Sequence, residues 1–315
     1  MQIDAVITWV DGSDPSHVQK LKFFLEKHGI EPREAASPTR FNDSGEIEYC
    51  LRAILHFAPW IRRIHIVTDQ QTPKIIQKLQ DRSCLNKINL VDHREIFKGY
   101  EHCLPTFNSI SIESMLWRIP ELAEHFIYFN DDCFLLRPVL PTDFFRDDMP
   151  ILRGFWKKQI DKQWQAYLRP IWPKKISLHR STQEHAAQLA GEQRYFFHLH
   201  HVPFPLKKTA FEQFFRSHPD LLEENIRHQL RHKTQFMPMS LIYHALIKQK
   251  AAILEHRHQE IMIHAALHTM RKIKARLKCA VKDSRILFAC IQSLDEATFD
   301  RSQQLHAWLK QRIPE

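Results

Sequence analysis

Two adjacent carboxylates, Asp131 and Asp132, have the clearest chemical potential in this sequence. They directly follow an apolar run at 126–129 and Asn130. Aromatic, aliphatic and β-branched residues in such a run predict a short buried strand. Because burying an uncompensated charge is costly, the pair must face water, a cation or a metal at the carboxyl end of that strand. Ligands bind at that end of open α/β sheets, although a strand that runs into an acidic surface turn is the simpler alternative.

Other aspartates follow predicted strands in the same way, which favours the functional interpretation of the pair. Strands are predicted at 3–10, 64–68 and 88–91, and they end at Asp11, Asp69 and Asp92. Trp9 and Asp11 are placed to stack on a base and to bind a ribose or a metal-bound phosphate. The simpler interpretation of these two is a core Trp and a helix N-cap.

Helices are predicted between these strands, at 16–28, 46–57, 74–79 and about 110–119. Asp43 or Ser44 is expected to cap the second of them. On that helix Glu48 and Arg52 stand at i, i+4, so they can simply pair with each other. The alternation of strands and helices over 1–135 predicts a doubly wound α/β sheet.

The second half of the chain has a different composition. Between 156 and 175, Trp and basic residues interleave with prolines, which suggests an insertion that contacts glycan or lipid. The core is expected to return at 198–203. The later segments predict, in order, a helix at 208–217, largely helical structure over 223–248, a basic helix at 264–282 and a strand at 286–291.

Length and composition narrow the class of protein. The chain has 315 residues, of which 43% are hydrophobic and 26% charged, as in soluble globular proteins. We expect no transmembrane helix, because no run approaches eighteen apolar residues. The N-terminus lacks the features of a secretory signal, and the six cysteines show no CxxC or zinc-ligand spacing. Reduced thiols and a cytoplasmic location are therefore expected.

The net charge of +9 suits an anionic partner, such as nucleic acid, a nucleotide, a phosphorylated glycan or a membrane face. Only six glycines occur, and none belongs to a GxGxxG or GxxxxGK[ST] motif. The sequence therefore argues against a dinucleotide-binding Rossmann site and a P-loop. The 21 histidines include no HExxH.

Taken together, these segments resemble the Stealth family of sugar-phosphate transferases in four ordered blocks. The first block is similar to 3–15, and the second to 40–52, 58–62, 66–69, 104–109, 112–114 and 126–132. The third resembles His201-Val202-Pro203, and the fourth Arg231-His232 together with 288–291. The chain departs from the family after His232, where an acidic residue is missing, and after Ile291, where Gln292-Ser293 replaces an Asn-Asp pair. Both departures lie in the C-terminal part, to which the resemblance assigns the handling of the acceptor.

The resemblance implies a fold and a reaction. The fold is a GT-A-like, nucleotide-sugar-binding core with a helical insertion and a mostly helical C-terminal part, divided as 1–140, 141–198 and 199–315. The reaction is transfer of a hexose-1-phosphate, such as N-acetylhexosamine-1-phosphate, from a UDP-sugar to a glycan hydroxyl. It forms a phosphodiester and releases UMP, in capsule or cell-surface polysaccharide synthesis. A diphosphate donor needs a hard cation, Mg²⁺ or Mn²⁺, which a carboxylate pair can hold.

The resemblance also assigns roles to residues of this sequence. Asp131 and Asp132 are the expected metal ligands. The expected catalytic residues are Asp132, His201, Arg231 and His232, and the general base is left open between Asp132 and His201. The expected donor-binding residues are Trp9, Asp11, Asp14, Asp43, Glu46, Arg52, Asp69 and Asn108.

Two other functions remain open from the sequence. A conventional UDP-sugar glycosyltransferase would use the same core but release UDP. A basic nucleic-acid-binding protein would explain the net charge and the Lys/Arg-rich helix at 271–285. It would leave the strand-end carboxylates unexplained, and no nucleic-acid motif is present. We therefore expect a UDP-sugar donor, an anionic or lipid-linked glycan acceptor, no nucleic acid, and peripheral association with the inner face of the cytoplasmic membrane.

Overall fold

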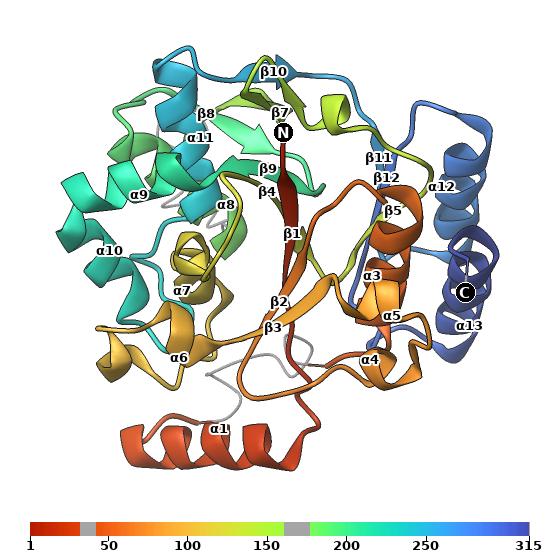
Figure 1. The fold of residues 1–315 in the computed structure, drawn as a ribbon, viewed down its shortest axis with the longest axis horizontal. Coiled ribbons are helices and arrows are strands. Elements are labelled where there is room, and N and C mark those ends of the chain that lie inside the picture. Colours follow the sequence, from red (N-terminus) through yellow and green to blue (C-terminus); the bar gives the residue numbers. More distant parts are fainter. Residues whose placement is uncertain (32–41, 161–176, 315) are drawn as a thin grey trace, which may run out of the picture.

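A five-stranded sheet forms the centre of the molecule (Figure 1). The computed structural model describes residues 1–31, 42–160 and 177–314. The strand order is β3-β2-β1-β4-β9. The first four strands are parallel: β1 (Ile3–Thr8), β2 (Ile64–Thr68), β3 (Ile88–Asp92) and β4 (His125–Asn130). The fifth strand, β9 (Phe204–Lys207), pairs antiparallel with β4. This sheet confirms the expected α/β class.

Both faces of the sheet are buried, because its strands point alternate side chains into two hydrophobic cores. On β1, Ala5 and Ile7 pack into one core and Val6 into the other. In the first core they meet α3 (Glu46–Phe57), and in the second β4 meets α11 (Pro238–Lys248). Helices thus cover both faces, as expected for a doubly wound sheet (Figure 1).

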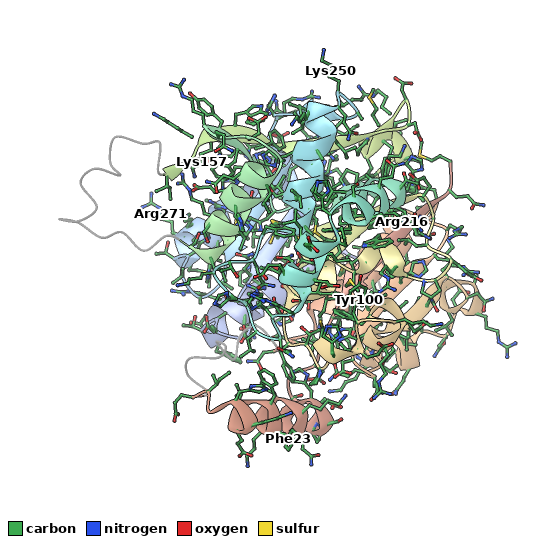
Figure 2. All side chains as sticks on the ribbon, turned by 90° about the vertical axis from the view of Figure 1, so that its left-hand side faces the viewer. Phe23, Tyr100, Lys157, Arg216, Lys250 and Arg271 are labelled. Carbon is green, nitrogen blue, oxygen red and sulfur yellow. The ribbon has the colours of Figure 1, made fainter. Side chains whose placement is uncertain are left out.

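The other helices of the first half are short, except for α1. They are α1 (Pro15–His28), α4 (Lys74–Lys78), α5 (Arg82–Leu85), α6 (His93–Ile96) and α7 (Ser109–Glu113). Helix α1 lies at the periphery, where its Phe23 points away from the body and is 66% exposed (Figure 2). The helix predicted at 110–119 is shorter in the structure, because α7 ends at Glu113 and a 3₁₀ turn (Leu116–Arg118) follows.

Two smaller sheets flank the central one. One contains β6 (Phe145–Arg146), β7 (Met149–Lys158), β8 (Tyr195–Leu199) and β10 (Ile253–Glu255). The other contains β5 (Cys133–Leu135), β11 (Glu260–His264) and β12 (Phe288–Gln292). The remaining helices are α8 (Leu178–Leu189), α9 (Lys208–Ser217), α10 (Pro219–Ile226), α12 (Met270–Lys282) and α13 (Phe299–Arg312).

Three local predictions were wrong. The cap of α3 is Gly45 at φ 95°, and Asp43 accepts a hydrogen bond from its backbone N–H. The segment predicted as largely helical over 223–248 contains two helices, and residues 227–237 between them are not helical. Pro238 starts the second helix, and a proline disfavours helical structure in the residue before it. The basic helix begins at Met270 rather than 264, because residues 260–264 pair as β11.

Two further expectations from the sequence concern the thiols and membrane-spanning helices. All six cysteines are free, as expected. Within the described ranges, no helix is long and apolar enough to cross a membrane. The start of the predicted Trp/Lys-rich insertion, 156–158, belongs to strand β7. Its remainder at 161–176 lies outside the described residues, as do most of the predicted loop at 31–39 and the family-block residues 40–41.

Candidate active site

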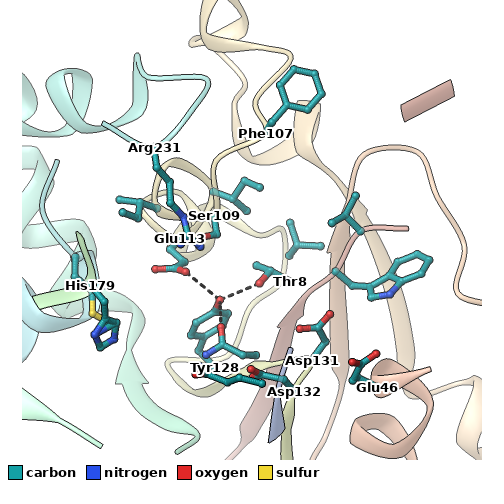
Figure 3. A pocket seen from close by; sticks show the side chains of 18 of the residues that line it. Thr8, Glu46, Phe107, Ser109, Glu113, Tyr128, Asp131, Asp132, His179 and Arg231 are labelled. Atoms are coloured by element: carbon teal, nitrogen blue, oxygen red, sulfur yellow. Dashed lines mark hydrogen bonds between the residues drawn. The ribbon is translucent and has the colours of Figure 1, made fainter. Parts of the chain in front are cut away.

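A cleft of about 640 Å³ lies at the carboxyl ends of β1 and β4 (Figure 3). Four groups of its lining residues bear on the chemistry. These are Thr8, Trp9 and Asn130, Asp131, Asp132 from the strand ends; Glu46 from α3; Ser109 and Glu113 from α7; and His179, His201 and Arg231 from the second half of the chain. The predicted acidic pair therefore lies in a cavity at the sheet edge where α/β proteins bind ligands.

Carboxylates crowd one side of the cleft. Burial, followed by the charges of Asp132, Glu46 and Asp43, raises the pKa of Asp131 well above its ordinary value. Burial also raises the pKa of Asp132 to about 6 and that of Glu46 to about 8. Within the described part of the chain, no Lys or Arg forms an ion pair with any of Glu46, Asp131 and Asp132. A hard divalent cation would relieve this repulsion, and its preferred ligands are such oxygens.

The carboxylate of Asp132 also faces two thiols. Cys133 Sγ lies 3.5 Å from Asp132 Oδ1, and Cys290 Sγ lies 3.6 Å from Oδ2. The hydrogen bond to Cys133 and burial hold the pKa of Cys290 well above its ordinary value. Cys290 therefore remains a neutral thiol that donates to the carboxylate. A soft metal would need a thiolate, so this side of the cleft suits an oxygen-liganded cation better.

Tyr128 connects the two strand ends to α7. Its hydroxyl lies 2.8 Å from Thr8 Oγ1, 2.9 Å from Asn130 Oδ1 and 3.3 Å from Glu113 Oε1 (Figure 3). Burial raises the pKa of Glu113 to about 7, although the nearby Arg231 charge opposes the shift. A carboxyl group with a pKa near neutrality is suited to accept a proton in a reaction.

Cationic and imidazole groups occupy the other side of the cleft. Arg231 Nη2 donates a hydrogen bond to Ser109 Oγ at 2.8 Å, beside Glu113 (Figure 3). The rings of His179 and His201 stack with centroids 4.7 Å apart. Burial lowers the pKa of each imidazole to about 4, so both are neutral near pH 7. Neutral rings can donate and accept hydrogen bonds without adding charge.

The structure brings together about half of the predicted site residues. The cleft is lined by Trp9, Glu46, Asp69, Asp131, Asp132, His201 and Arg231. Asp69 also forms an ion pair with Lys20 Nζ at 2.9 Å. Asp43 does not line the cleft, but it accepts a hydrogen bond from Trp9 Nε1 at 3.0 Å and so fixes the indole there.

The other predicted residues have local structural contacts. Asp14 caps α1, and Asp11 accepts hydrogen bonds from Ser13 in the turn before it. Arg52 pairs with Glu48 at 2.9 Å, which is the i, i+4 alternative open from the sequence.

Asn108 and His232 belong to the support of the cleft. Asn108 is fully buried, caps α7, and donates to the His228 carbonyl at 2.8 Å. His232 is exposed, and its Nδ1 lies 2.8 Å from Thr234 Oγ1.

Several lining residues were not singled out from the sequence, among them Glu113, Tyr128 and His179. Glu113 and Tyr128 lie within the family-like second block, but a lone glutamate on a short helix and a strand tyrosine carry no motif. Their importance follows from burial and from their mutual hydrogen bond. No sequence pattern distinguished His179, which follows the undescribed residues 161–176.

Two family models match the chain. One is described as Stealth protein CR1, conserved region 1, and matches residues 1–29. The other is Stealth protein CR2, conserved region 2, and matches residues 40–151. They correspond to the first two family-like blocks, whereas the third and fourth blocks remain predictions.

Curated relatives with phosphotransferase names are similar to a large part of the chain. A capsular polysaccharide phosphotransferase of Neisseria meningitidis serogroup B is 32% identical, over 76% of this chain and 62% of that protein. A capsular polysaccharide phosphotransferase of Aeromonas hydrophila is 37% identical, over 68% of this chain and 57% of that protein. An exopolysaccharide phosphotransferase of Streptomyces coelicolor is 34% identical, over 77% of this chain and 39% of that protein. The chain thus spans less than two thirds of the length of these relatives.

Solved glycosyltransferases align with nearly the whole chain at low identity and with TM-scores below 0.5. The galactosyltransferase LgtC has a TM-score of 0.45 at 12% identity, over 99% of this chain and 97% of that chain. Mouse xyloside xylosyltransferase 1 has a TM-score of 0.44 at 11% identity, over 92% of this chain and 97% of that chain. Likeness at this level says nothing about substrate or mechanism.

Proposed function

Because this chain belongs to the Stealth family, we propose that it transfers a sugar-1-phosphate from a UDP-sugar to a hydroxyl group of a glycan. The observation that carries the proposal is the cleft, which has crowded carboxylates on one side and Arg231 beside Glu113 on the other. A diphosphate bound with a divalent cation supplies the charges that both sides lack. The names of the relatives support a role in capsule or exopolysaccharide synthesis.

The proposed reaction is an attack at phosphorus. The acceptor oxygen bonds to the phosphorus that carries the sugar, and the bond from that phosphorus to the bridging oxygen breaks. UMP leaves with the electron pair, and the hydroxyl proton passes to a base. Charge then gathers on the transferred phosphoryl oxygens, where a guanidinium such as that of Arg231 can bind two of them at once.

Asp131 and Asp132 would hold Mg²⁺ or Mn²⁺, with Glu46 nearby. The cation would neutralise the donor diphosphate and make the nucleotide a better leaving group. Two observations support this fit. The pKa values of these carboxyl groups are raised, and within the described residues no Lys or Arg forms an ion pair with them.

Glu113 is our choice for the general base. Its pKa of about 7 is closer to neutrality than those of the other two candidates, about 6 for Asp132 and about 4 for His201. Asp132 is also engaged with the thiols of Cys133 and Cys290. This choice leaves His201 as a neutral hydrogen-bonding partner of the substrate, together with His179.

The acceptor would approach over basic surface. On α12 the residues Ile273, Leu277 and Ala280 are buried, and the exposed side carries Arg271, Lys272, Lys274, Lys278 and Lys282. Such a side suits an anionic or lipid-linked glycan at the inner face of the cytoplasmic membrane, to which the protein would bind peripherally. Co-sedimentation with anionic vesicles should fall as the salt concentration rises, and binding that ignores ionic strength would contradict this assignment.

The released nucleotide tests the proposed reaction. The protein should be incubated with a panel of UDP-sugars, Mg²⁺ and glycan acceptors, and the nucleotide identified by chromatography. UMP in a one-to-one ratio with acceptor extension is expected. UDP as the stoichiometric product would show attack at the sugar carbon, and thus a conventional glycosyltransferase. A UDP-sugar with Mg²⁺ should also protect the protein from heat, whereas an oligonucleotide should not.

A further inference from the structure

A second group of metal-binding side chains lies outside the cleft. It consists of His200, His258 and Glu260, which we call the His-His-Glu cluster. His200 lies between β8 and β9, and its backbone N–H donates to the Arg153 carbonyl of β7. The other two members lie where the chain passes from β10 into β11. The cluster therefore joins segments that are about 60 residues apart in sequence and belong to different sheets.

The ligand atoms are spaced as a small metal ion requires. Glu260 Oε1 lies 3.3 Å from His200 Nδ1 and 3.1 Å from His258 Nδ1. The three ligand atoms all lie within 4.8 Å of one another. Around a tetrahedral zinc ion with bonds of about 2.0–2.2 Å, neighbouring ligand atoms stand roughly 3.3–3.5 Å apart. The two contacts to Glu260 are close to that spacing.

The burial of His200 is a second, independent sign of a ligand. Its side chain is only 3% exposed, and neither ring nitrogen has a hydrogen bond of acceptable geometry. Buried polar atoms rarely lack a partner. The Glu260 side chain is only 10% exposed, and its carboxylate faces both imidazoles. Its Oε2 accepts from the Gln259 backbone, which turns Oε1 toward the imidazoles.

We propose that the His-His-Glu cluster binds Zn²⁺. Two imidazoles and one carboxylate form a ligand set that zinc favours, whereas Mg²⁺ prefers oxygen ligands alone. The rings of His200 and His258 stack with centroids 4.5 Å apart and planes 7° apart, so one ring must turn to direct its lone pair at a shared ion. His258 is 71% exposed and has room to turn. Solvent at this open side supplies water as the fourth ligand.

The position of the site indicates its role. His200 directly precedes His201, which lines the cleft, and Glu260 begins the strand that pairs with β12. The end of β12 contributes Gln292 to the cleft. Zinc in the cluster would fasten the segment that carries His201 to the neighbouring sheet. His200 and Glu260 do not line the cleft and are thus positioning residues.

Metal binding by the purified, chelator-treated protein tests the proposal without an activity assay. Zn²⁺ should be titrated against an indicator in millimolar Mg²⁺, which would occupy the carboxylates of the cleft. We expect one equivalent of tightly bound Zn²⁺, and Co²⁺ in its place should give the absorption of a tetrahedral site. His258→Ala and Glu260→Gln should each weaken Zn²⁺ binding at least about tenfold, because even outer partners of metal ligands contribute that much.

The matched control is His102→Ala, which removes an exposed histidine from another part of the surface. It should keep the affinity of the parent protein, and Zn²⁺ should raise the Tm of both. The Tm of the two cluster variants should not respond to Zn²⁺. Because His258 is exposed, its replacement leaves the fold intact. Equal Zn²⁺ affinity in the parent, the two cluster variants and His102→Ala would overturn the proposal. So would the absence of Zn²⁺ binding in millimolar Mg²⁺.

Discussion

Replacing Glu113 by Gln should stabilise this protein at alkaline pH. The buried carboxyl group has a pKa of about 7, raised from an ordinary value of 4.5. Its folded-state pKa is raised, so the stability it contributes is fully present below pH 4.5 and is lost as the pH rises through 7. The shift is about 2.5 pKa units, and each unit corresponds to about 1.36 kcal/mol, so the ionised group costs about 3 kcal/mol. A neutral Gln of the same shape escapes that cost.

The measurement is urea unfolding of the parent and Glu113→Gln at pH 4.5 and pH 8.5. The difference in unfolding free energy between the two proteins should move by about 3 kcal/mol in favour of the variant at the higher pH. Glu296→Gln is the matched control, because Glu296 is exposed. The difference in unfolding free energy between Glu296→Gln and the parent should be nearly the same at both pH values.

An effect of Glu113→Gln that does not change with pH would refute the reasoning, because Glu113 would then ionise as readily as in the unfolded chain. Activity adds an independent comparison. If Glu113 is the general base, the variant should lose about 10²–10⁴-fold in rate while gaining stability. Loss of rate with gain of stability distinguishes a functional carboxylate from a structural one.

Other predictions test the cleft and the core. Arg231→Lys should reduce kcat strongly, because an ammonium cannot reproduce bidentate phosphate binding. Asp131→Asn should remove metal-dependent activity and keep the circular dichroism spectrum of the parent. Burial lowers the pKa of His244 to about 4, so an NMR titration of its ring should have a midpoint near pH 4, and stability should fall as the pH drops from 6.5 toward 4. Gly154→Ala should destabilise by about 1–3 kcal/mol in urea unfolding, because a Cβ there would lie 2.8 Å from a Phe197 ring carbon and closer still to the His198 carbonyl.

The central sheet could be predicted because its strands are buried on both faces. Such strands form nearly continuous apolar runs, and the runs at 3–8, 64–68 and 126–129 have this form. The strand β5 was not predicted, because three residues after an acidic turn give no periodic signal. The position of β9 beside β4 was also hidden, since their pairing joins residues about 80 positions apart.

The acidic side of the site could be predicted from the strand pattern, whereas His201 and Arg231 on the opposite side were reached only through the family resemblance. Asp131 and Asp132 follow a strand, and the end of a strand is a place that the sequence defines. Arg231 lies in a segment whose course depends on tertiary contacts. Residues chosen for their chemical type alone, such as Asp14 and Arg52, instead have ordinary local partners, an N-cap bond and an i, i+4 ion pair.

The non-helical segment 227–237 explains how Arg231 reaches the cleft. Buried amides hold this segment, because Asn108 donates to the His228 carbonyl at 2.8 Å and to Gln235 Oε1 at 2.9 Å. Gln235 in turn accepts from the backbone N–H of His232 at 2.9 Å. Arg231 is thereby held against Ser109 at the start of α7, the helix that also carries Glu113. The same short helix thus positions the cation expected at the transferred phosphoryl group and the carboxylate proposed as its base. A continuous helix through 227–237 would lose these amide contacts, so the chain keeps an irregular segment where its periodicity favours a helix.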